Sequence, residues 1–402
     1  MTMLHGVRTL AGVALAVAAP LAQAEGLDSL QFALAGGAVN FDGRLRYEAV
    51  DQNNPLQNAD AATIRARLGY TTRKWNYLDA SAEYEGVTYV GDEQYDNNPG
   101  PTGQAGYSVV ADPRGSELNQ AWVRFTGIPQ TAVKLGRQRL IFDNARFIGN
   151  VGWRQNEQTF DGYLLTNTAL PKTTASYAFL TNANTIFFTD LRMHSHVANV
   201  AVAPSPVFGA TAYGYLLDFD ASAPRTDSQT LGLRVAGAIP VAETVRLGYT
   251  LEYADQADYA DAPATVDAGY YLAELGVAHF DKLAAKLGYE VLGGDGVYGF
   301  QTPLATLHAF QGWADVFLTT PAVGIRDAYA SLGGKILNVP LLAVYHEYTA
   351  DQGGADLGTE VNVQATYACT PALSFGAKVA DYNAQTFSVD TGKVWLWTEY
   401  RF

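Results

Sequence analysis

The 402-residue chain has a single cysteine, Cys369, so no disulfide forms within it and no cluster of thiols holds a metal. After residue 24 it also has no stretch of about 18 uninterrupted apolar residues, which excludes an α-helical membrane protein. Charged residues are few, 16% of the chain, whereas tyrosine and glycine are abundant, with 24 and 39 copies. This composition is typical of a large antiparallel sheet, and of neither a long-helix protein nor a disordered one.

Positive charge is also scarce. The chain has 40 acidic and 26 basic residues, a net charge of −14, so nucleic acid is not an expected partner. The deficit is uneven, because residues 25–154 hold 13 basic and 15 acidic side chains whereas residues 155–402 hold 12 and 25. Most basic residues of the first part are arginines within strand-like patterns, so arginine is concentrated in the first third of the chain.

The first 24 residues have the features of a secretory signal peptide. Arg8 gives a weakly positive start, residues 10–21 are apolar, and Ala22 and Ala24 form a small-x-small cleavage site. The apolar stretch is too short for a comfortable membrane-spanning helix. We therefore expect residues 1–24 to be removed on export and residues 25–402 to form the folded protein.

Apolar and polar residues alternate with a period of two in many windows. In residues 39–50, Phe41, Leu45 and Tyr47 alternate with Arg44 and Arg46. The same texture recurs at 63–71, 120–125, 230–238, 244–253, 270–280, 283–292, 326–337, 341–349, 358–369, 372–382 and 392–402. Such alternation predicts strands with one apolar and one polar face.

The connections between these windows indicate how the strands are joined. Eight short turns alternate with nine longer loops, which predicts eighteen strands with both chain ends on the short-turn side. This asymmetry is typical of an all-β fold, a transmembrane antiparallel β-barrel with short periplasmic turns and long extracellular loops. The sheet must close, because lipid offers no partner for a free strand edge. We therefore expect a Gram-negative outer-membrane location, with membrane lipid as a partner.

The last strand ends on aromatic residues, which belong at the headgroup level of a membrane. Trp395, Trp397, Tyr400 and the terminal Phe402 make up this ending. It resembles the C-terminal recognition signal of outer-membrane proteins.

Arginines within three of the strand windows are the sharpest functional signal. If the apolar faces contact lipid, the lumen receives Arg44, Arg46, Arg65, Arg67 and Arg124. An arginine on the lipid face would cost roughly 2–4 kcal/mol near mid-membrane, so the inward orientation is favoured. A guanidinium holds a carboxylate in a two-pronged contact, and a ladder of such groups passes an anion from site to site. The set therefore predicts an anion-conducting lumen.

The alternative is a structural network in which carboxylates neutralise these arginines. The candidate counter-charges on neighbouring windows are Asp42, Glu48, Asp79, Glu83 and Glu85.

Residues 134–162 combine two arginine clusters with a bend rich in glycine and asparagine. Arg137 and Arg139 share their parity with Leu135, so this face cannot contact lipid throughout. A bulge at Gly136, or apolar residues that face inward near the periplasm, would resolve the conflict. We expect both arginines to face the lumen. Their expected partners are Glu157 and Asp161.

Residues 141–156 form the third long loop, which we expect to fold into the barrel as a constriction. The loop would then bring four polar side chains into the pore, Arg146, Asn150, Arg154 and Gln155. The alternative is a surface loop over the mouth of the barrel.

Residues 293–323 form the longest loop and contain a predicted helix at 304–318. This segment is unusually apolar for an exposed loop, so it should pack against the inner wall, other loops or a partner. Its role is then either a gate or a packed lid. Together with 91–116 and 141–156, it makes up the set of loops expected to fold inward or to cap the barrel.

Two segments resemble the alginate-export family of outer-membrane porins. The first has LGRQRL at residues 135–140, followed by the arginine-rich loop, WRQN and FDG. The second is GGDGVYGFQTPLATLHAFQGWADVFLTTP at residues 293–321. The likeness covers about residues 38–402. It implies a monomeric eighteen-stranded channel whose arginine-lined lumen passes a polyanion.

This chain departs from the family pattern in being acidic overall. We therefore expect passive passage of anionic or polar solutes, with a uronate polysaccharide such as alginate as the substrate that the resemblance implies.

Other functions have weaker support. His194, Ser195 and His196 suggest a hydrolase, but in a strand the serine points away from both histidines, so no nucleophile–base pair forms. Acidic residues in the outer loops could bind Ca²⁺, but no calcium-loop pattern is present. The sequence thus predicts no enzyme, catalytic residue, metal or cofactor. An outer-membrane enzyme and a plugged structural or adhesion barrel remain the alternatives.

Overall fold

The computed structural model describes residues 27–100, 102–221, 226–279 and 282–402. The expected signal peptide lies outside these residues. The described chain forms one antiparallel sheet, and its strands in order are β1 (Ala38–Gln52), β2 (Ala59–Thr71), β3 (Leu78–Tyr89), β4 (Gly115–Ile128), β5 (Thr131–Gln138), β6 (Thr159–Asn167), β7 (Thr173–Asn184), β8 (Asp190–Ser205), β9 (Phe208–Leu217), β10 (Ser228–Ala242), β11 (Val245–Ala257), β12 (Asp267–His279), β13 (Leu283–Leu292), β14 (Ile325–Ile336), β15 (Val339–Thr349), β16 (Asp356–Ala368), β17 (Leu373–Ala384) and β18 (Thr391–Arg401).

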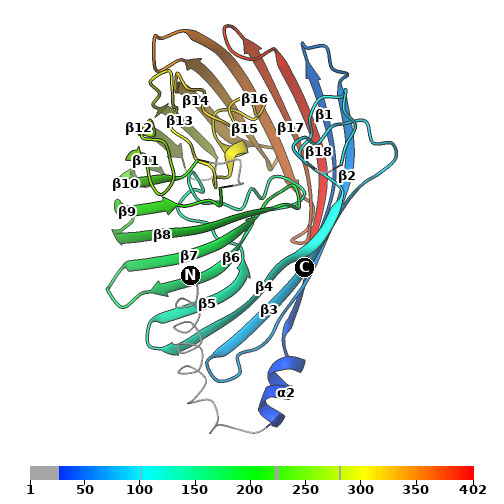
Figure 1. The fold of residues 1–402 in the computed structure, drawn as a ribbon, viewed down its shortest axis with the longest axis vertical. Coiled ribbons are helices and arrows are strands. Elements are labelled where there is room, and N and C mark those ends of the chain that lie inside the picture. The colour runs from blue at the N-terminus through cyan, green and yellow to red at the C-terminus, as the bar shows by residue number, and fades with distance from the viewer. Residues whose placement is uncertain (1–26, 101, 222–225, 280–281) are drawn as a thin grey trace, which may run out of the picture.

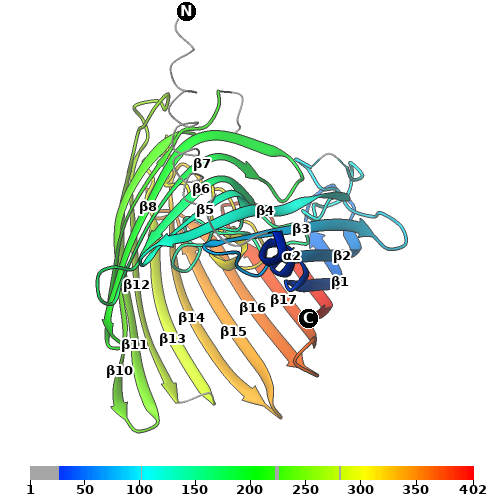
Figure 2. The same cartoon turned by 90° about the horizontal axis from the view of Figure 1, so that it is seen from below.

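The sheet closes on itself. β1 pairs antiparallel with β2 on one side and with β18 on the other, so the eighteen described strands form a barrel without a free edge. Figures 1 and 2 show the wall curving round to this seam. The predicted fold class and strand number are confirmed. Each wall strand finds its backbone partners on its neighbours, as lipid requires.

The alternation of side chains separates an outer from an inner face. On β1, Leu45 is 45% exposed, whereas Arg44, Arg46 and Glu48 are buried. The same pattern on β2 leaves Leu68 exposed. Apolar side chains thus cover the outside, and polar side chains line the inside.

Connections at the two ends differ in length, as predicted. At one end two-residue turns join β4 to β5, β8 to β9 and β14 to β15. At the other end lie the β3–β4 loop (residues 90–114), the β5–β6 loop (139–158) and the β13–β14 loop (293–324). The aromatic C-terminus lies at the short-turn end, where the Phe402 ring stacks on Phe41 with their centroids 5.6 Å apart.

A short helix, α2 (Leu27–Ala35), precedes β1 and lies at the short-turn end (Figure 1). The Arg73 backbone N–H donates to the Ala33 carbonyl at 3.1 Å, and the Trp75 indole donates to Ser29 at 3.1 Å. The period-two alternation of the sequence does not predict this helix. Within the described ranges no helix has the length and apolar character needed to cross a membrane.

The helix expected at residues 304–318 is wrong. This segment contains only the 3₁₀ turn η2 (Leu307–Ala309). Gln311 and Gly312 have φ values of 49° and 81°, which are left-handed conformations that end a right-handed helix. The backbone N–H of Ala314 donates to the Glu360 side chain of β16 at 2.9 Å instead of continuing a helical ladder. Contacts with the wall therefore override the apolar periodicity.

Two of the long loops pack together inside the barrel. Ile148 of the β5–β6 loop forms a parallel bridge with Leu304 of the β13–β14 loop, and the Gly149 N–H donates to the Leu304 carbonyl at 2.9 Å. Phe147 packs on Tyr213 and Tyr270 of the inner wall. A second apolar cluster joins the β13–β14 loop to β14–β18 and includes Trp313, Phe317, Tyr348, Tyr382 and Trp395. The two loops therefore occupy part of the lumen.

Candidate functional site

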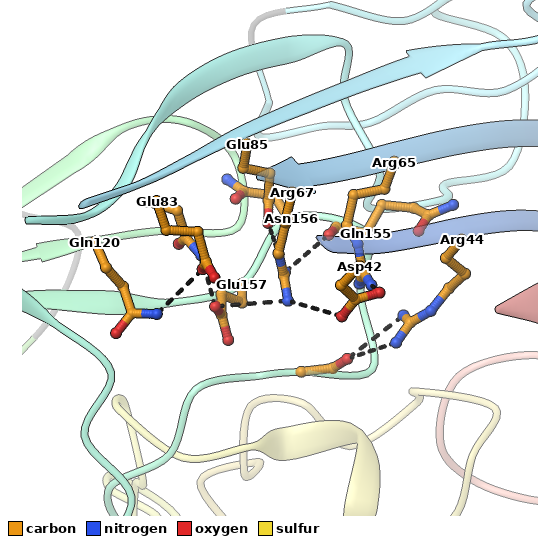
Figure 3. A network of polar contacts seen from close by, with 12 residues as sticks. Asp42, Arg44, Arg65, Arg67, Glu83, Glu85, Gln120, Gln155, Asn156 and Glu157 are labelled. Carbon is orange, nitrogen blue, oxygen red and sulfur yellow. Dashed lines mark hydrogen bonds and ion pairs between the residues drawn. The ribbon is translucent and has the colours of Figure 1, made fainter. Parts of the chain in front are cut away.

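The inner face of β1, β2 and β18 carries an arginine-rich wall. Arg44 and Arg65 lie directly opposite each other in the β1–β2 register. Arg44 contacts Glu399 at 3.0 Å, and Arg65 contacts both Asp42 and Glu399, the latter at 3.4 Å. Figure 3 shows part of this network (Asp42, Arg44 and Arg65). The repulsion between two facing cations is thus offset by carboxylates placed between them.

The next arginines along these strands have partners from the loops. Arg46 contacts Asp112 of the β3–β4 loop and lies 3.6 Å from Glu48. Arg67 contacts Glu85 of β3 and lies 3.5 Å from Glu157 of the β5–β6 loop. The structure therefore places the four arginines of β1 and β2 on the lumen face and gives each a carboxylate partner. A bare cationic ladder is absent from this part of the described wall.

Arg124 lies on the inner face nearer the short-turn end. It contacts Asp79 through two nitrogens, with Nε at 3.0 Å from Oδ1, and its side chain is 41% exposed. The ammonium group of Lys134 lies 4.3 Å from the centre of the Trp122 ring beside it. This region is polar and more open than the arginine-rich wall.

Arg137 was expected to face the lumen, but it lies on the other face of the wall. The β4–β5 register runs without a shift from Arg137 to Val133, so Arg137 shares a face with Leu135, which is 52% exposed on the outside. Gly136 has a φ of 114° but does not interrupt the register. Arg137 pairs instead with Asp161 on the same outer face, at 2.9 Å. Both residues lie near the long-loop end of their strands, which explains how the wall tolerates them.

Arg139 follows β5 and does join the lumen network. It contacts Glu157 and lies 3.7 Å from Glu83, and its side chain is 35% exposed. Glu157 also accepts hydrogen bonds from Asn119 at 2.7 Å and Asn150 at 2.6 Å. Burial opposes ionisation of Glu157, but the charge of Arg67 and the hydrogen bonds from Arg139 and Asn119 outweigh it and lower its pKa to about 2.

Arg146 fastens the loops to the wall. It is 1% exposed and donates to Glu290 of β13 at 2.7 Å, to Thr302 at 3.1 Å and to Gln311 at 3.2 Å. Arg146 thus ties the β5–β6 loop to β13 and to the β13–β14 loop. Arg146 itself is enclosed by protein and has no open face toward a solute.

Arg154 lies at a junction of five elements around Asp315. One nitrogen of Arg154 donates to Glu48 at 2.9 Å and another to Asp315 at 2.7 Å. Asp315 also accepts from Lys393 of β18 at 3.0 Å and contacts His308 at 2.6 Å. Burial lowers the pKa of His308 to about 3 even though Asp315 favours its charged form. The imidazole is therefore neutral, with Nδ1–H toward Asp315 and Nε2 toward the Lys378 ammonium group at 3.0 Å.

This junction is not predictable from any single stretch of the sequence. Its members come from β1, the two loops, β17 and β18, and no local pattern links them. The plane of Trp153 stacks on His308 with centroids 4.8 Å apart, which covers the junction on the side of the arginine-rich wall.

Beside the arginine-rich wall lies a cavity of about 470 Å³, which we name the arginine cavity. Its lining consists of Asn40, Phe41, Asp42, Arg44, Arg67, Glu83, Arg139, Asn150, Gly152, Glu157, Arg401 and Phe402. Acceptors and donors alternate around this space, and Arg139 and Arg401 are its most exposed cations, with side chains 35% and 58% exposed.

The residues considered for hydrolysis are separated by the wall. Ser195 is buried on the inner face, where its Oγ accepts from the Asp218 N–H at 3.0 Å, whereas His194 is exposed on the other face. In the described residues no group of three or more His, Cys, Asp or Glu side chains is placed to hold a metal ion.

A closed eighteen-stranded barrel with an apolar exterior, a polar lumen and inward-folded loops defines an outer-membrane β-barrel of the channel class. Residues 39–289 match the family model described as alginate export, which covers more than half of the chain. The chain belongs to the alginate export family.

Solved structures of outer-membrane channels share its fold. OpdK of Pseudomonas aeruginosa, solved with vanillate, is 13% identical, with a TM-score of 0.73 over 92% of this chain and 99% of that one. OccAB4 of Acinetobacter baumannii is 15% identical, with a TM-score of 0.69 over 91% of this chain and 98% of that one. OpdL of Pseudomonas aeruginosa is 18% identical, with a TM-score of 0.70 over 92% and 99%. No curated protein sequence matches this chain.

Proposed function

We propose that this protein is a passive outer-membrane channel for anionic and polar solutes, with selectivity set in the arginine cavity. The observation that carries the proposal is Arg139, a lumen cation with an accessible side chain at the base of an inward-folded loop. The arginines deeper in the wall are covered by protein, with side-chain exposures of 9% for Arg44 and 6% for Arg67. They set the local charge, and Arg139 meets the solute.

Charge compensation around the cavity suits passage rather than tight binding. A solute carboxylate that reaches Arg139 competes with Glu157 and Glu83, which already hold the guanidinium. Conduction needs such weak, replaceable contacts, because a site that holds its ion too tightly does not release it. The wall therefore favours anions modestly and also accommodates neutral polar groups.

The donors and acceptors of the cavity also suit a hydroxylated solute. Asn150 and Asn40 offer amide groups beside the guanidinium groups and carboxylates. A sugar acid carries both a carboxylate for Arg139 and hydroxyl groups for these partners. The family to which the chain belongs supports a uronate saccharide as this solute, and the vanillate in the OpdK structure is likewise a carboxylate.

Planar-bilayer recording of the purified full-length protein tests this function. We expect single-channel conductance and a reversal potential that indicates a modest preference for anions over cations in a salt gradient. Arg139→Gln should reduce or reverse that preference and weaken block by glucuronate, because one of the two accessible cations of the cavity is removed. Arg124→Gln is the matched control, since Arg124 is equally open but lies outside the arginine cavity. Absence of conductance would exclude a channel, and cation preference in the wild type would exclude the anionic version.

A further inference from the structure

A second cavity of about 410 Å³ lies across the lumen, between β10–β15 and the β13–β14 loop. Much of its lining is apolar or aromatic, and we name it the aromatic cavity. The larger apolar and aromatic residues of the lining are Leu272, Phe310, Trp313, Tyr329, Leu342 and Val344. It differs from the arginine cavity, whose lining is mostly charged.

The carboxylates around the aromatic cavity already have donors. Glu274 accepts from Lys286 at 2.5 Å and from the Tyr329 hydroxyl at 2.6 Å. Glu290, 3% exposed, accepts from Arg146 and from the Tyr270 hydroxyl, both at 2.7 Å. Both carboxylates therefore already accept hydrogen bonds, in part from Lys286 and Tyr329 of the cavity lining itself.

The third lining carboxylate, Asp327, is also occupied. It is 1% exposed and pairs with the Nδ1 atom of His346, which lies 2.9 Å from Oδ1 and 3.0 Å from Oδ2. The acidic groups of this wall are therefore balanced by partners before any solute arrives.

The cations retain donors that these pairs do not use. Lys286 commits one of its three N–H groups to Glu274, and its side chain is 44% exposed. Arg234 gives Nη1 to Glu252 at 2.5 Å, which leaves Nε and Nη2 outside that pair. The cavity thus combines cationic N–H donors with apolar walls. Its carboxylate acceptors already accept hydrogen bonds from protein groups.

We propose that the aromatic cavity is a binding subsite for a small monocarboxylate with an apolar or aromatic body. Lys286 and Arg234 receive the carboxylate, and the body packs among Phe310, Trp313 and Leu342. A polyhydroxylated acid is disfavoured here, because its hydroxyl groups would lose water without finding acceptors on apolar walls. The subsite rests on the proposed function only in requiring that solutes enter the lumen.

Binding of benzoate to the purified full-length protein tests the subsite, with gluconate as the hydroxylated acid and benzyl alcohol as the uncharged ring. We expect benzoate to bind more tightly than either, as measured by saturation-transfer NMR and calorimetry. Lys286→Gln should weaken benzoate about tenfold, the size expected for a lost charge-assisted hydrogen bond. Lys286→Arg should retain most of the affinity, which separates loss of the cation from damage to the barrel.

The two cavities provide the control for each other. Arg139→Gln should leave benzoate affinity unchanged, and Trp313→Leu should weaken benzoate while sparing acetate. Equal weakening of benzoate by Arg139→Gln and Lys286→Gln would overturn the proposal, as would unchanged affinity in Lys286→Gln. Conductance without benzoate binding would refute the subsite alone. Benzoate binding without conductance would refute the proposed channel and leave the subsite standing.

Discussion

The two sides of the lumen are stabilised in different ways. Along β1, β2 and β18, the side chains are charged and each contact is directional, as between Arg44 and Glu399. Along β7–β9 and β12, aromatic and aliphatic side chains such as Tyr213 and Tyr270 form a broad apolar surface. The β5–β6 loop crosses between them, with Phe147 on the aromatic side and Arg154 on the charged side. One loop is thus anchored by apolar packing at Phe147 and by ion pairs at Arg154.

The comparison implies different tolerance to substitution. Area burial is insensitive to the exact position of atoms, so similar side chains exchange at modest cost. A buried ion pair depends on both partners, because losing one leaves an uncompensated charge in a low-dielectric site.

The largest effect is expected at the junction of the charged side. Arg154→Ala should lower the free energy of unfolding by roughly 3–5 kcal/mol, because Glu48 and Asp315 would remain buried without their shared cation. Arg154→Lys should recover little of the loss, since one ammonium group cannot contact both carboxylates as the guanidinium fork does. Urea unfolding in lipid vesicles, followed by tryptophan fluorescence, measures the difference.

Arg326→Ala is the control for this prediction. Arg326 pairs with Asp351 at 2.8 Å, but its side chain is 41% exposed, so about 1 kcal/mol or less should be lost. If Arg154→Ala is as mild as Arg326→Ala, the junction does not hold the loop.

A smaller effect is expected on the aromatic side. Phe147→Leu should cost about 1 kcal/mol, because the leucine keeps most of the apolar contact with Tyr213, Tyr270 and Phe300. Phe147→Ala should cost about 3 kcal/mol through the cavity it leaves. In the same unfolding assay, the loss of unfolding free energy should therefore depend on the volume removed at Phe147 and on the geometry of the charged group at Arg154. A loss in Phe147→Leu equal to that in Phe147→Ala would contradict the proposed difference between the sides.

The two sides also differ in how well the sequence predicts them. Alternation along single strands is local, so the inward arginines of β1 and β2 and the closed barrel follow from the pattern. The partner of Arg154, Asp315, lies 161 positions away and is brought close only by two loops that fold inward. Arg137 faces outward because it lies two residues after Leu135 in an unbroken strand register. The free-energy cost of an arginine that contacts lipid at mid-membrane does not apply near the rim of the barrel. The backbone of residues 311–314 likewise takes its shape from Glu360, which no local signal reveals.

Acid should weaken the charged side alone. The folded-state pKa of Glu157 is about 2, below the usual 4.5, so its stabilisation is full above pH 4.5 and is lost as the pH falls toward 2. His308 has a folded-state pKa of about 3 against the usual 6.5, so the unfolded chain binds a proton first and stability falls as pH drops from 6.5 toward 3. One such proton gives a slope of up to about 1.4 kcal/mol per pH unit.

The pH dependence of the urea midpoint checks this assignment. His308→Gln should flatten the curve between pH 6.5 and 4.5 and leave the loss below 4.5, where Glu157 titrates. Phe147→Leu should shift the whole curve without changing its shape. A curve for His308→Gln that parallels the wild type between pH 6.5 and 4.5 would show that another group carries the transition.

The smallest expected effect lies at the open end of the charged side. Arg124→Gln should change the free energy of unfolding by less than about 1 kcal/mol, because the exposed pair with Asp79 is weakened by solvent. Its reversal potential should stay near the wild-type value, whereas Arg139→Gln should shift it toward cations. Arg124 and Arg139 have similar exposure, at 41% and 35% of the side chain, so exposure alone predicts equal shifts. Only the position of Arg139 beside Glu157 and Asn150, in the arginine cavity, predicts unequal ones. Equal shifts in the two variants would mean that selectivity is spread along the charged side.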